Sequence, residues 1–243
     1  LLPPVPPLYD RTRKAAEEKG VSRQGIEVAI SGAMPLSASV VEPWEALTGG
    51  YLVEGYGLSE CSPVLMANPV APNRKAGTVG LPVPGTEIRI VNPDNPSEDV
   101  PPGEPGELIV RGPQVFSGYW NKPEATAEVF VDGWFRTGDI VSMDDEGFVT
   151  ITDRIKELVI TGGFNVSPSE VEDMLRNYDG VEDVAIVGIP DARDGEHVVA
   201  AIVPKPGATI DTDALRAWAK QQLAAYKVPR RVVLIDELPK SMI

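Results

Sequence analysis

The segment Tyr56-Gly57-Leu58-Ser59-Glu60, followed far downstream by Trp134-Phe135-Arg136-Thr137-Gly138-Asp139, is the most informative part of this sequence. The first segment offers an aromatic ring, a flexible glycine, a hydroxyl and a carboxylate in close succession. The Glu60 carboxylate can hold Mg²⁺, which prefers oxygen ligands and bridges to substrate phosphates. In the second segment Asp139 ends an Arg-Thr-Gly-Asp turn, where an acidic side chain can take both hydroxyls of a ribose. Together the two segments predict a nucleotide-handling site.

The pattern of hydrophobic, proline and glycine residues changes twice along the sequence. Up to residue 60, hydrophobic periodicity and glycine stops predict a helix, a buried strand, a second helix capped by Ser37, and a short strand at 51–53. From 77 to 152, short strands punctuated by Pro and Gly predict a small barrel or distorted sheet. Beyond Arg154 the pattern predicts a compact α/β domain with a strand–helix–strand–strand–helix–strand order. Its first helix is predicted to start at the capping box Ser167-Pro168-Ser169-Glu170 and to end at Gly180.

Composition narrows the classes of function. The 243 residues carry a formal charge of −14, which argues against a nucleic-acid binder and against tight docking on anionic lipid. The single cysteine, Cys61, excludes an internal disulfide framework and lacks a nearby base to activate it as a nucleophile. The single histidine, His197, which we expect at the surface, excludes a Ser-His-Asp hydrolase and a histidine-rich metal site. No apolar run approaches the length of a membrane span, and no signal peptide is visible.

Further segments share the order and spacing of one family. The sequence resembles the acyl-adenylate-forming enzymes, which include acyl-CoA synthetases, luciferases and peptide-synthetase adenylation domains, and most of all the bacterial long-chain fatty-acid–CoA ligases. The resemblance covers essentially the whole chain, and so many matches in sequence make it strong. The segments that carry it, besides the opening two, are 5–9, 31–36, 106–108 with 118–119, 153–156, 162–165, 168–172, 190–191 with 195–196, and 238–241.

The resemblance implies a mixed α/β fold: residues 1–154 would be the end of a large AMP-binding domain, with a β-rich subdomain at about 77–152. Residues 155–243 would be a small mobile α+β domain. The family's phosphate loop would lie before residue 1, and its adenylation lysine shortly after Lys240, which is not that lysine. We therefore expect a piece of an enzyme, inactive alone.

The resemblance also assigns the candidate site. Tyr56 would stack on adenine, Gly32 and Ala33 would pass along it, and Gly57 would belong to the same nucleotide surface. Ser59 would bind the phosphate and Glu60 would bind Mg²⁺. Without the family, Tyr56 reads as a half-buried core residue, Glu60 as a surface carboxylate, and Gly32-Ala33 as an ordinary turn.

Three further roles follow from the resemblance. Asp139 would bind the ribose, assisted by Arg154, and Lys156 would be the hinge of the small domain. Gly162 and Gly163 would line the passage for CoA. Without the family, Arg154 would be part of an exposed ion pair and Lys156 a solvated lysine. Gly162 and Gly163 would be the two glycines of an ordinary hairpin turn.

The implied reaction converts ATP, a fatty acid and CoA into acyl-CoA, AMP and pyrophosphate through an acyl-adenylate, with Mg²⁺. Its partners would be these small molecules, with no nucleic acid. The resemblance implies a cytoplasmic protein with at most peripheral association with the inner membrane face, and it allows a homodimer. An acyl-AMP ligase, an aryl-CoA ligase and a non-catalytic nucleotide-binding homologue remain open alternatives.

Overall fold

The computed structural model describes residues 6–21, 25–32, 36, 38–191 and 195–239. The chain forms two compact units, Leu1–Ile151 and Thr152–Ile243. The division falls three residues before the sequence-based boundary at 154/155, and the assignment of each unit to a domain stays a prediction. Within the described residues, no helix combines the length and the apolar character needed to cross a bilayer.

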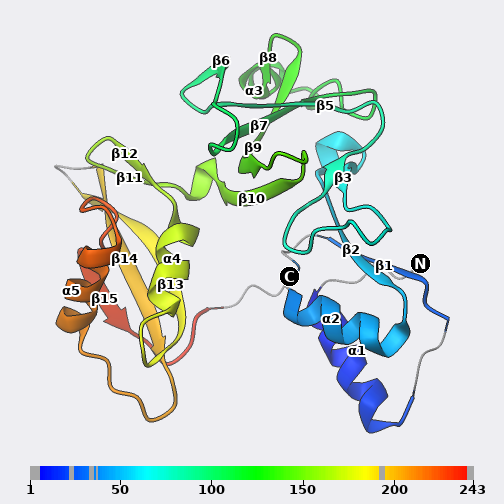
Figure 1. The fold of residues 1–243 in the computed structure, drawn as a ribbon. Helices are drawn as coiled ribbons and strands as arrows, with labels where there is room; N and C mark the ends of the chain where they lie inside the picture. Colours follow the sequence, from blue (N-terminus) through cyan, green and yellow to red (C-terminus); the bar gives the residue numbers. More distant parts are fainter. Residues whose placement is uncertain (1–5, 22–24, 33–35, 37, 192–194, 240–243) are drawn as a thin grey trace. The chain divides into compact units, whose positions relative to one another are not determined.

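The first unit begins with two helices beside a small sheet (Figure 1). Strand β1 (Val28–Ser31) pairs in parallel with β2 (Tyr51–Gly57), so both strands end at the same edge. Helix α1 (Pro6–Glu18) lies against α2 (Ala38–Thr48). Their contact centres on Tyr9 and Trp44, fully buried side chains whose rings meet edge to face at 4.7 Å. Burying these large aromatic rings removes much apolar surface from water and fixes the helix pair.

A second sheet carries the β-rich part of the first unit. Its strand order is β10-β9-β7-β5-β6, with β8 paired to β9, and this nearly closed, barrel-like sheet agrees with the predicted small barrel. Its core residues, including Leu108, Val110, Phe135 and Val149, are buried. The remaining elements of this unit are η1 (Ser59–Cys61), β3 (Val64–Ala67), β4 (Leu81–Pro82), β5 (Glu87–Asn92), β6 (Asn95–Asp99), β7 (Gly106–Arg111), α3 (Pro123–Val129), β8 (Phe130–Val131), β9 (Trp134–Met143) and the first half of β10 (Val149–Arg154), which crosses the division between the units.

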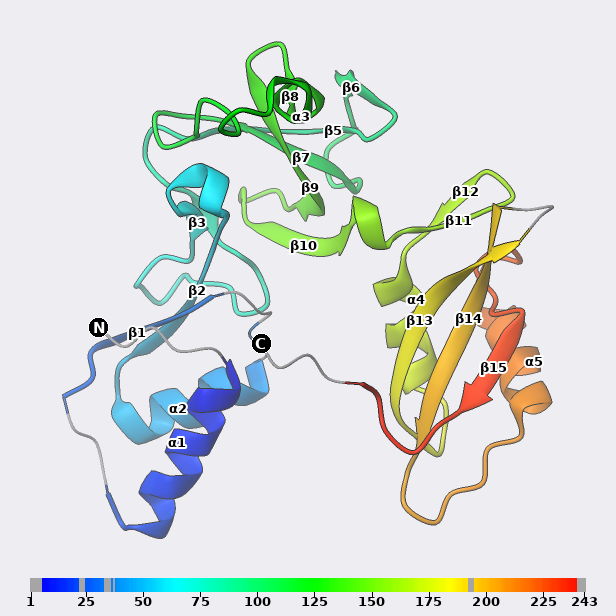
Figure 2. The same cartoon turned by 180° about the vertical axis from the view of Figure 1, so that it is seen from behind.

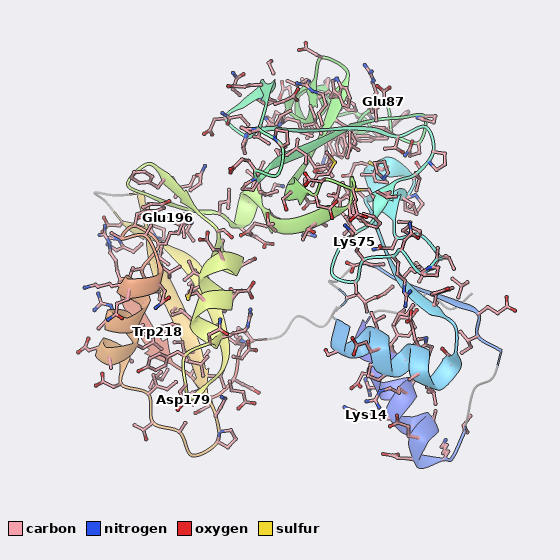
Figure 3. The ribbon with its side chains drawn as sticks, in the orientation of Figure 1. Lys14, Lys75, Glu87, Asp179, Glu196 and Trp218 are labelled. Atoms are coloured by element: carbon pink, nitrogen blue, oxygen red, sulfur yellow. The ribbon has the colours of Figure 1, made fainter. Side chains whose placement is uncertain are left out.

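The second unit is an α/β layer in which α4 and α5 cover the same face of one sheet (Figures 1 and 2). The sheet runs β12-β11-β14-β13, with β15 paired to β14. Trp218 lies on the helical side of the sheet (Figure 3), where its ring packs against Tyr178 with centroids 5.3 Å apart. Its elements are η2 (Ile155–Glu157), β11 (Val159–Thr161), β12 (Phe164–Val166), α4 (Pro168–Arg176), β13 (Val181–Asp191), β14 (Gly195–Pro204), α5 (Thr212–Gln222) and β15 (Arg231–Leu234).

The capping box at the start of α4 forms only in part. Ser167 Oγ accepts the backbone N–H of Glu170 at 3.2 Å, as predicted. The Glu170 carboxylate does not complete the box with Ser167, because it accepts two hydrogen bonds from Lys227 Nζ at 2.6 Å. Ser167 Oγ instead donates to the buried Asp153 carboxylate at 2.6 Å. The start of α4 is therefore anchored to Asp153, in the part of β10 that belongs to the second unit.

Several sequence-based boundaries need correction. The helix predicted to run to Gly180 ends at Arg176, and the strand predicted at 51–53 extends to Gly57. The strand β6 was missed because its composition, Asn-Pro-Ser-Glu-Asp, reads as a turn.

His197 is half-buried, not free at the surface, and its Nε2 lies 2.9 Å from Asp191 Oδ2. The cap predicted at Ser37 lies outside the described residues.

Candidate nucleotide site

The carboxyl ends of β1 and β2 form one edge of the first sheet. Parallel pairing sets Ser31 beside Glu54. Gly32 therefore lies just beyond the end of β1, and Tyr56 lies next to the last residue of β2. In open α/β sheets, ligands bind in the crevice outside the carboxyl ends of parallel strands. A Cβ added to Gly32 would lie 3.4 Å from the Gly55 carbonyl oxygen, at the close end of ordinary van der Waals contact. Ala33, the other residue predicted to pass along the adenine, lies outside the described residues.

The structure joins the two segments that define the predicted site. Tyr56 OH donates a hydrogen bond to Asp139 Oδ2, across 83 positions of sequence. Burial raises the pKa of the Tyr56 phenol, and the neighbouring Asp139 charge raises it further, so the phenol keeps its proton and acts as the donor. The Tyr56 ring packs against the core of the barrel-like sheet. This half-buried position is the one expected of a core tyrosine, and stacking on adenine stays a prediction.

Asp139 stands on a bulge in β9, and not on a turn as the sequence suggested. Between the paired positions Glu107↔Ile140 and Ile109↔Arg136, β7 advances by fewer residues than β9, so 137–139 bulge opposite Leu108. Gly138 has a φ of +75°, a conformation that glycine adopts without strain. Bulges re-aim side chains and are common beside functional sites. The Arg-Thr-Gly-Asp segment is therefore a device that redirects Asp139.

Two neighbours of Asp139 brace this bulge. Thr137 Oγ1 donates to the Leu108 carbonyl at 2.8 Å and accepts the Asp139 N–H at 3.1 Å. Arg136 Nε bonds both carboxylate oxygens of Glu107, at 2.9 and 3.1 Å, and Glu107 is buried. Sequence reasoning gave Arg136 and Glu107 no role, although each stands in a segment that carried the family resemblance. The spacing alone could not show that they face each other across β7 and β9.

Gly57 has a structural reason that needs no ligand. A Cβ at this position would lie 1.7 Å from the Pro63 carbonyl oxygen, because β3 approaches β2 closely there. Its predicted contact with nucleotide stays a prediction. Ser59, exposed at the start of η1, and Glu60, half-exposed, follow directly. Cys61 is buried, and burial raises the pKa of its thiol to about 11, which agrees with its exclusion as a nucleophile.

The Glu60 carboxylate is a suitable Mg²⁺ ligand, because Mg²⁺ usually binds to one or two protein carboxylates together with substrate phosphates. Its Oε1 accepts a hydrogen bond from Tyr119 OH at 2.9 Å. Within the described residues, no group of three or more His, Cys, Asp or Glu side chains surrounds it. One or two carboxylates suffice for Mg²⁺ when phosphate oxygens and water complete the shell. A single oriented carboxylate is therefore a suitable partner for a metal that arrives with ATP.

The second unit holds the other residues that the sequence assigned to the site. Gly162 and Gly163 form the two-residue loop between β11 and β12, with φ of +57° and +81°. Both positive angles fit a type I′ hairpin turn, so the hairpin alternative accounts for the two glycines. Arg154 and Lys156 are exposed, and Lys156 lies in η2, a few residues after the division between the two units at 151/152. The hinge and the CoA passage stay predictions.

Glu54 is a buried carboxylate that sequence reasoning missed. Burial raises its pKa to about 7, partly offset by the Leu36 N–H, which donates to Glu54 Oε2 at 3.2 Å. A raised pKa means that the folded state binds this proton more tightly than the unfolded state. The stability contributed by protonated Glu54 is complete below pH 4.5 and disappears as the pH rises to about 7.

We predict that Glu54→Gln, which keeps an oxygen to accept the Leu36 N–H, gains stability relative to the wild type as the pH rises from 4.5 to about 7. The gain should be of the order of 2–3 kcal/mol, since each pKa unit corresponds to about 1.4 kcal/mol. Urea unfolding across this pH range measures it. Glu128→Gln, on an exposed carboxylate of α3, is the matched control. A constant difference between variant and wild type at every pH would contradict the prediction.

Comparison with known proteins agrees with this architecture. A family model for the AMP-binding enzyme matches residues 1–120, and a model for the AMP-binding enzyme C-terminal domain matches residues 170–242. The chain therefore belongs to the AMP-binding enzymes, the acyl-adenylate-forming family predicted from its sequence.

Three relatives illustrate the family. A long-chain-fatty-acid–CoA ligase of Escherichia coli O6:H1 is 44% identical over 234 residues, 96% of this chain and 41% of that protein. A feruloyl-CoA synthase of Amycolatopsis is 40% identical over 98% of this chain and 48% of that protein. ATP-bound MatB from Rhodopseudomonas palustris superposes with a TM-score of 0.82 and 39% identity, over 99% of this chain and 48% of that chain. The chain thus spans less than half the length of these relatives.

Proposed function

We propose that this chain contributes to a ligase that joins a long-chain fatty acid to CoA through an acyl-adenylate. The contact that best supports the proposal is the hydrogen bond from Tyr56 OH to Asp139 Oδ2, which joins the end of β2 to the bulge in β9 and so brings together the two segments predicted to handle the nucleotide. The 44% identity to long-chain-fatty-acid–CoA ligases supports the acyl class. The whole reaction and its substrates are part of the proposal, because the chain spans 41–43% of these relatives.

In the first half-reaction a fatty-acid carboxylate oxygen attacks the α-phosphorus of ATP, and pyrophosphate leaves. We assign Asp139 to the ribose hydroxyls, Tyr56 and Gly32 to the adenosine, and Ser59 to the phosphate as a hydrogen-bond donor. Glu60 would hold Mg²⁺, which spreads the phosphate charge during the displacement. Positioning and charge stabilisation lower most of the barrier in such reactions.

In the second half-reaction the thiol sulfur of CoA attacks the acyl carbon of the adenylate, and AMP leaves. We assign Lys156 to the hinge on which the second unit turns between the two steps, since hinges are element-terminal residues that absorb a backbone change. Arg154 would assist Asp139. Gly162 and Gly163 would border the pantetheine passage, where the absence of side chains leaves room.

An aryl-CoA ligase is the second candidate, because the feruloyl-CoA synthase relative is 40% identical over 98% of this chain. Both candidates share the first half-reaction and differ in the acid. Pyrophosphate release by the complete gene product, measured across a panel of fatty and aromatic acids with and without CoA, separates them. Release only with aromatic acids would exclude the long-chain proposal. Adenylate formation without transfer to CoA would point to an acyl-AMP ligase, and no release at all to a nucleotide-binding homologue.

We predict that Gly163→Leu still forms acyl-adenylate but transfers it to CoA roughly 10²-fold more slowly, because a misplacement of about 1 Å can be that costly. Single-turnover kinetics of each half-reaction in the complete gene product measure this. Gly207→Leu is the matched control: Gly207 also has a positive φ, +78°, and like Gly163 has no described atom within 4 Å of an added Cβ. Equal losses in both half-reactions, or the same selective loss in Gly207→Leu, would favour a hairpin glycine needed only for its backbone conformation.

A further inference from the structure

Glu60 is held by two bonds from a distant segment of the first unit. The backbone N–H of Phe116 donates to the Glu60 carbonyl oxygen at 2.7 Å. Tyr119 OH donates to Glu60 Oε1 at 2.9 Å, across 59 positions of sequence. One bond fixes the main chain at Glu60 and the other fixes its carboxylate. A half-exposed glutamate without such a partner would sample several rotamers in water.

The segment that carries Tyr119 is itself anchored. The rings of Phe116 and Tyr119 meet edge to face, with centroids 4.9 Å apart. The Tyr119 N–H donates to Thr126 Oγ1 at 2.9 Å, and this hydroxyl donates to the Lys122 carbonyl oxygen at 2.9 Å. The approach of Thr126 depends on Gly118, where an added Cβ would lie 2.6 Å from Thr126 Cγ2. The phenol therefore reaches Glu60 from a fixed backbone.

We propose that Tyr119 is a positioning residue that orients the Glu60 carboxylate for the Mg²⁺ of Mg²⁺·ATP. The inference rests on the proposed metal role of Glu60. Residues that hydrogen-bond a metal ligand fix its orientation, and their loss typically weakens metal binding 10- to 100-fold. A carboxylate already held in one orientation also loses less conformational freedom when the metal arrives. Tyr119 itself does not contact the metal or the nucleotide in this proposal.

The variant Tyr119→Phe tests this, because it keeps the ring against Phe116 and removes only the hydroxyl. Calorimetry on the complete gene product should show Mg²⁺·ATP binding weakened roughly tenfold, with binding of metal-free AMP unchanged. Electron paramagnetic resonance of Mn²⁺ in the presence of ATP should show a matching rise in the Mn²⁺ that is not bound to the protein. Tyr178→Phe, whose ring packs on Trp218 in the second unit, is the control and should change neither.

Glu60→Gln separates this inference from the proposed function. If Glu60→Gln leaves the metal dependence of ATP binding intact, the metal role of Glu60 is wrong and the inference falls with it. If Glu60→Gln removes that dependence and Tyr119→Phe binds Mg²⁺·ATP like the wild type, only the positioning role is overturned. An equal loss of metal-free AMP binding in Tyr119→Phe would also overturn it, since that result describes a purely structural hydroxyl.

Discussion

Asp139→Ala is expected to abolish adenylate formation in the complete gene product. Asp139 is buried and stands on the β9 bulge, where its carboxylate would accept both ribose hydroxyls of ATP. Each hydrogen bond to a charged group is worth about 1.5–3 kcal/mol. Two such bonds correspond to a loss of roughly 10²–10⁴-fold in kcat/KM, since each 1.4 kcal/mol is about tenfold. ATP-dependent pyrophosphate release measures the effect.

The control for Asp139 is Tyr56→Phe. Asp139→Ala also removes the acceptor of the Tyr56 hydroxyl, and an orphaned buried donor destabilises the fold by about 1–3 kcal/mol. Tyr56→Phe breaks the same hydrogen bond but leaves the carboxylate for the ribose. We expect this variant to retain most of the activity, and both variants to stay folded by circular dichroism. Near-normal pyrophosphate release by Asp139→Ala, or an equal loss in Tyr56→Phe, would refute the ribose assignment.

Arg136→Leu is expected to destabilise the first unit by about 3–5 kcal/mol, because it leaves the Glu107 carboxylate buried without its cation. For a domain of 150–250 residues this corresponds to a fall of roughly 6–20 °C in melting temperature. Thermal unfolding monitored by circular dichroism measures it. Arg111→Leu is the matched control in the same sheet: its partner Glu87 is exposed (Figure 3), and exposed pairs contribute about 1 kcal/mol or less.

A double variant identifies the cause of the loss. Arg136→Met combined with Glu107→Met removes both charges at once, and well-packed apolar residues often replace a buried ion pair at little cost. We expect this double variant to recover much of the stability that Arg136→Leu loses. A double variant as unstable as Arg136→Leu would mean that packing of the arginine stem, and not the unpaired carboxylate, explains the effect.

Local sequence signals predicted the elements that depend on local chemistry. The capping residue Ser167 starts α4 because a hydroxyl acceptor at that position satisfies a free N–H of the first turn. The short strands punctuated by Pro and Gly predicted the barrel-like sheet, and the order of motifs predicted the family. Strand and helix ends were less predictable: pairing with β3 extends β2 to Gly57, and α4 ends at Arg176, before Gly180.

Only the tertiary structure decided which residues face one another. Glu107 pairs with Arg136 across 29 positions of sequence because of the register of their strands. Tyr119 contacts Glu60 across 59 positions. Glu54 is buried by the packing around β2. The sequence determined which functional groups are present: the Glu60 carboxylate after Ser59, and the Asp139 carboxylate after Arg136-Thr137-Gly138. The fold determined its direction, because a bulge opposite Leu108 redirects Asp139 toward Tyr56, and backbone register is a property of paired strands that no single segment contains.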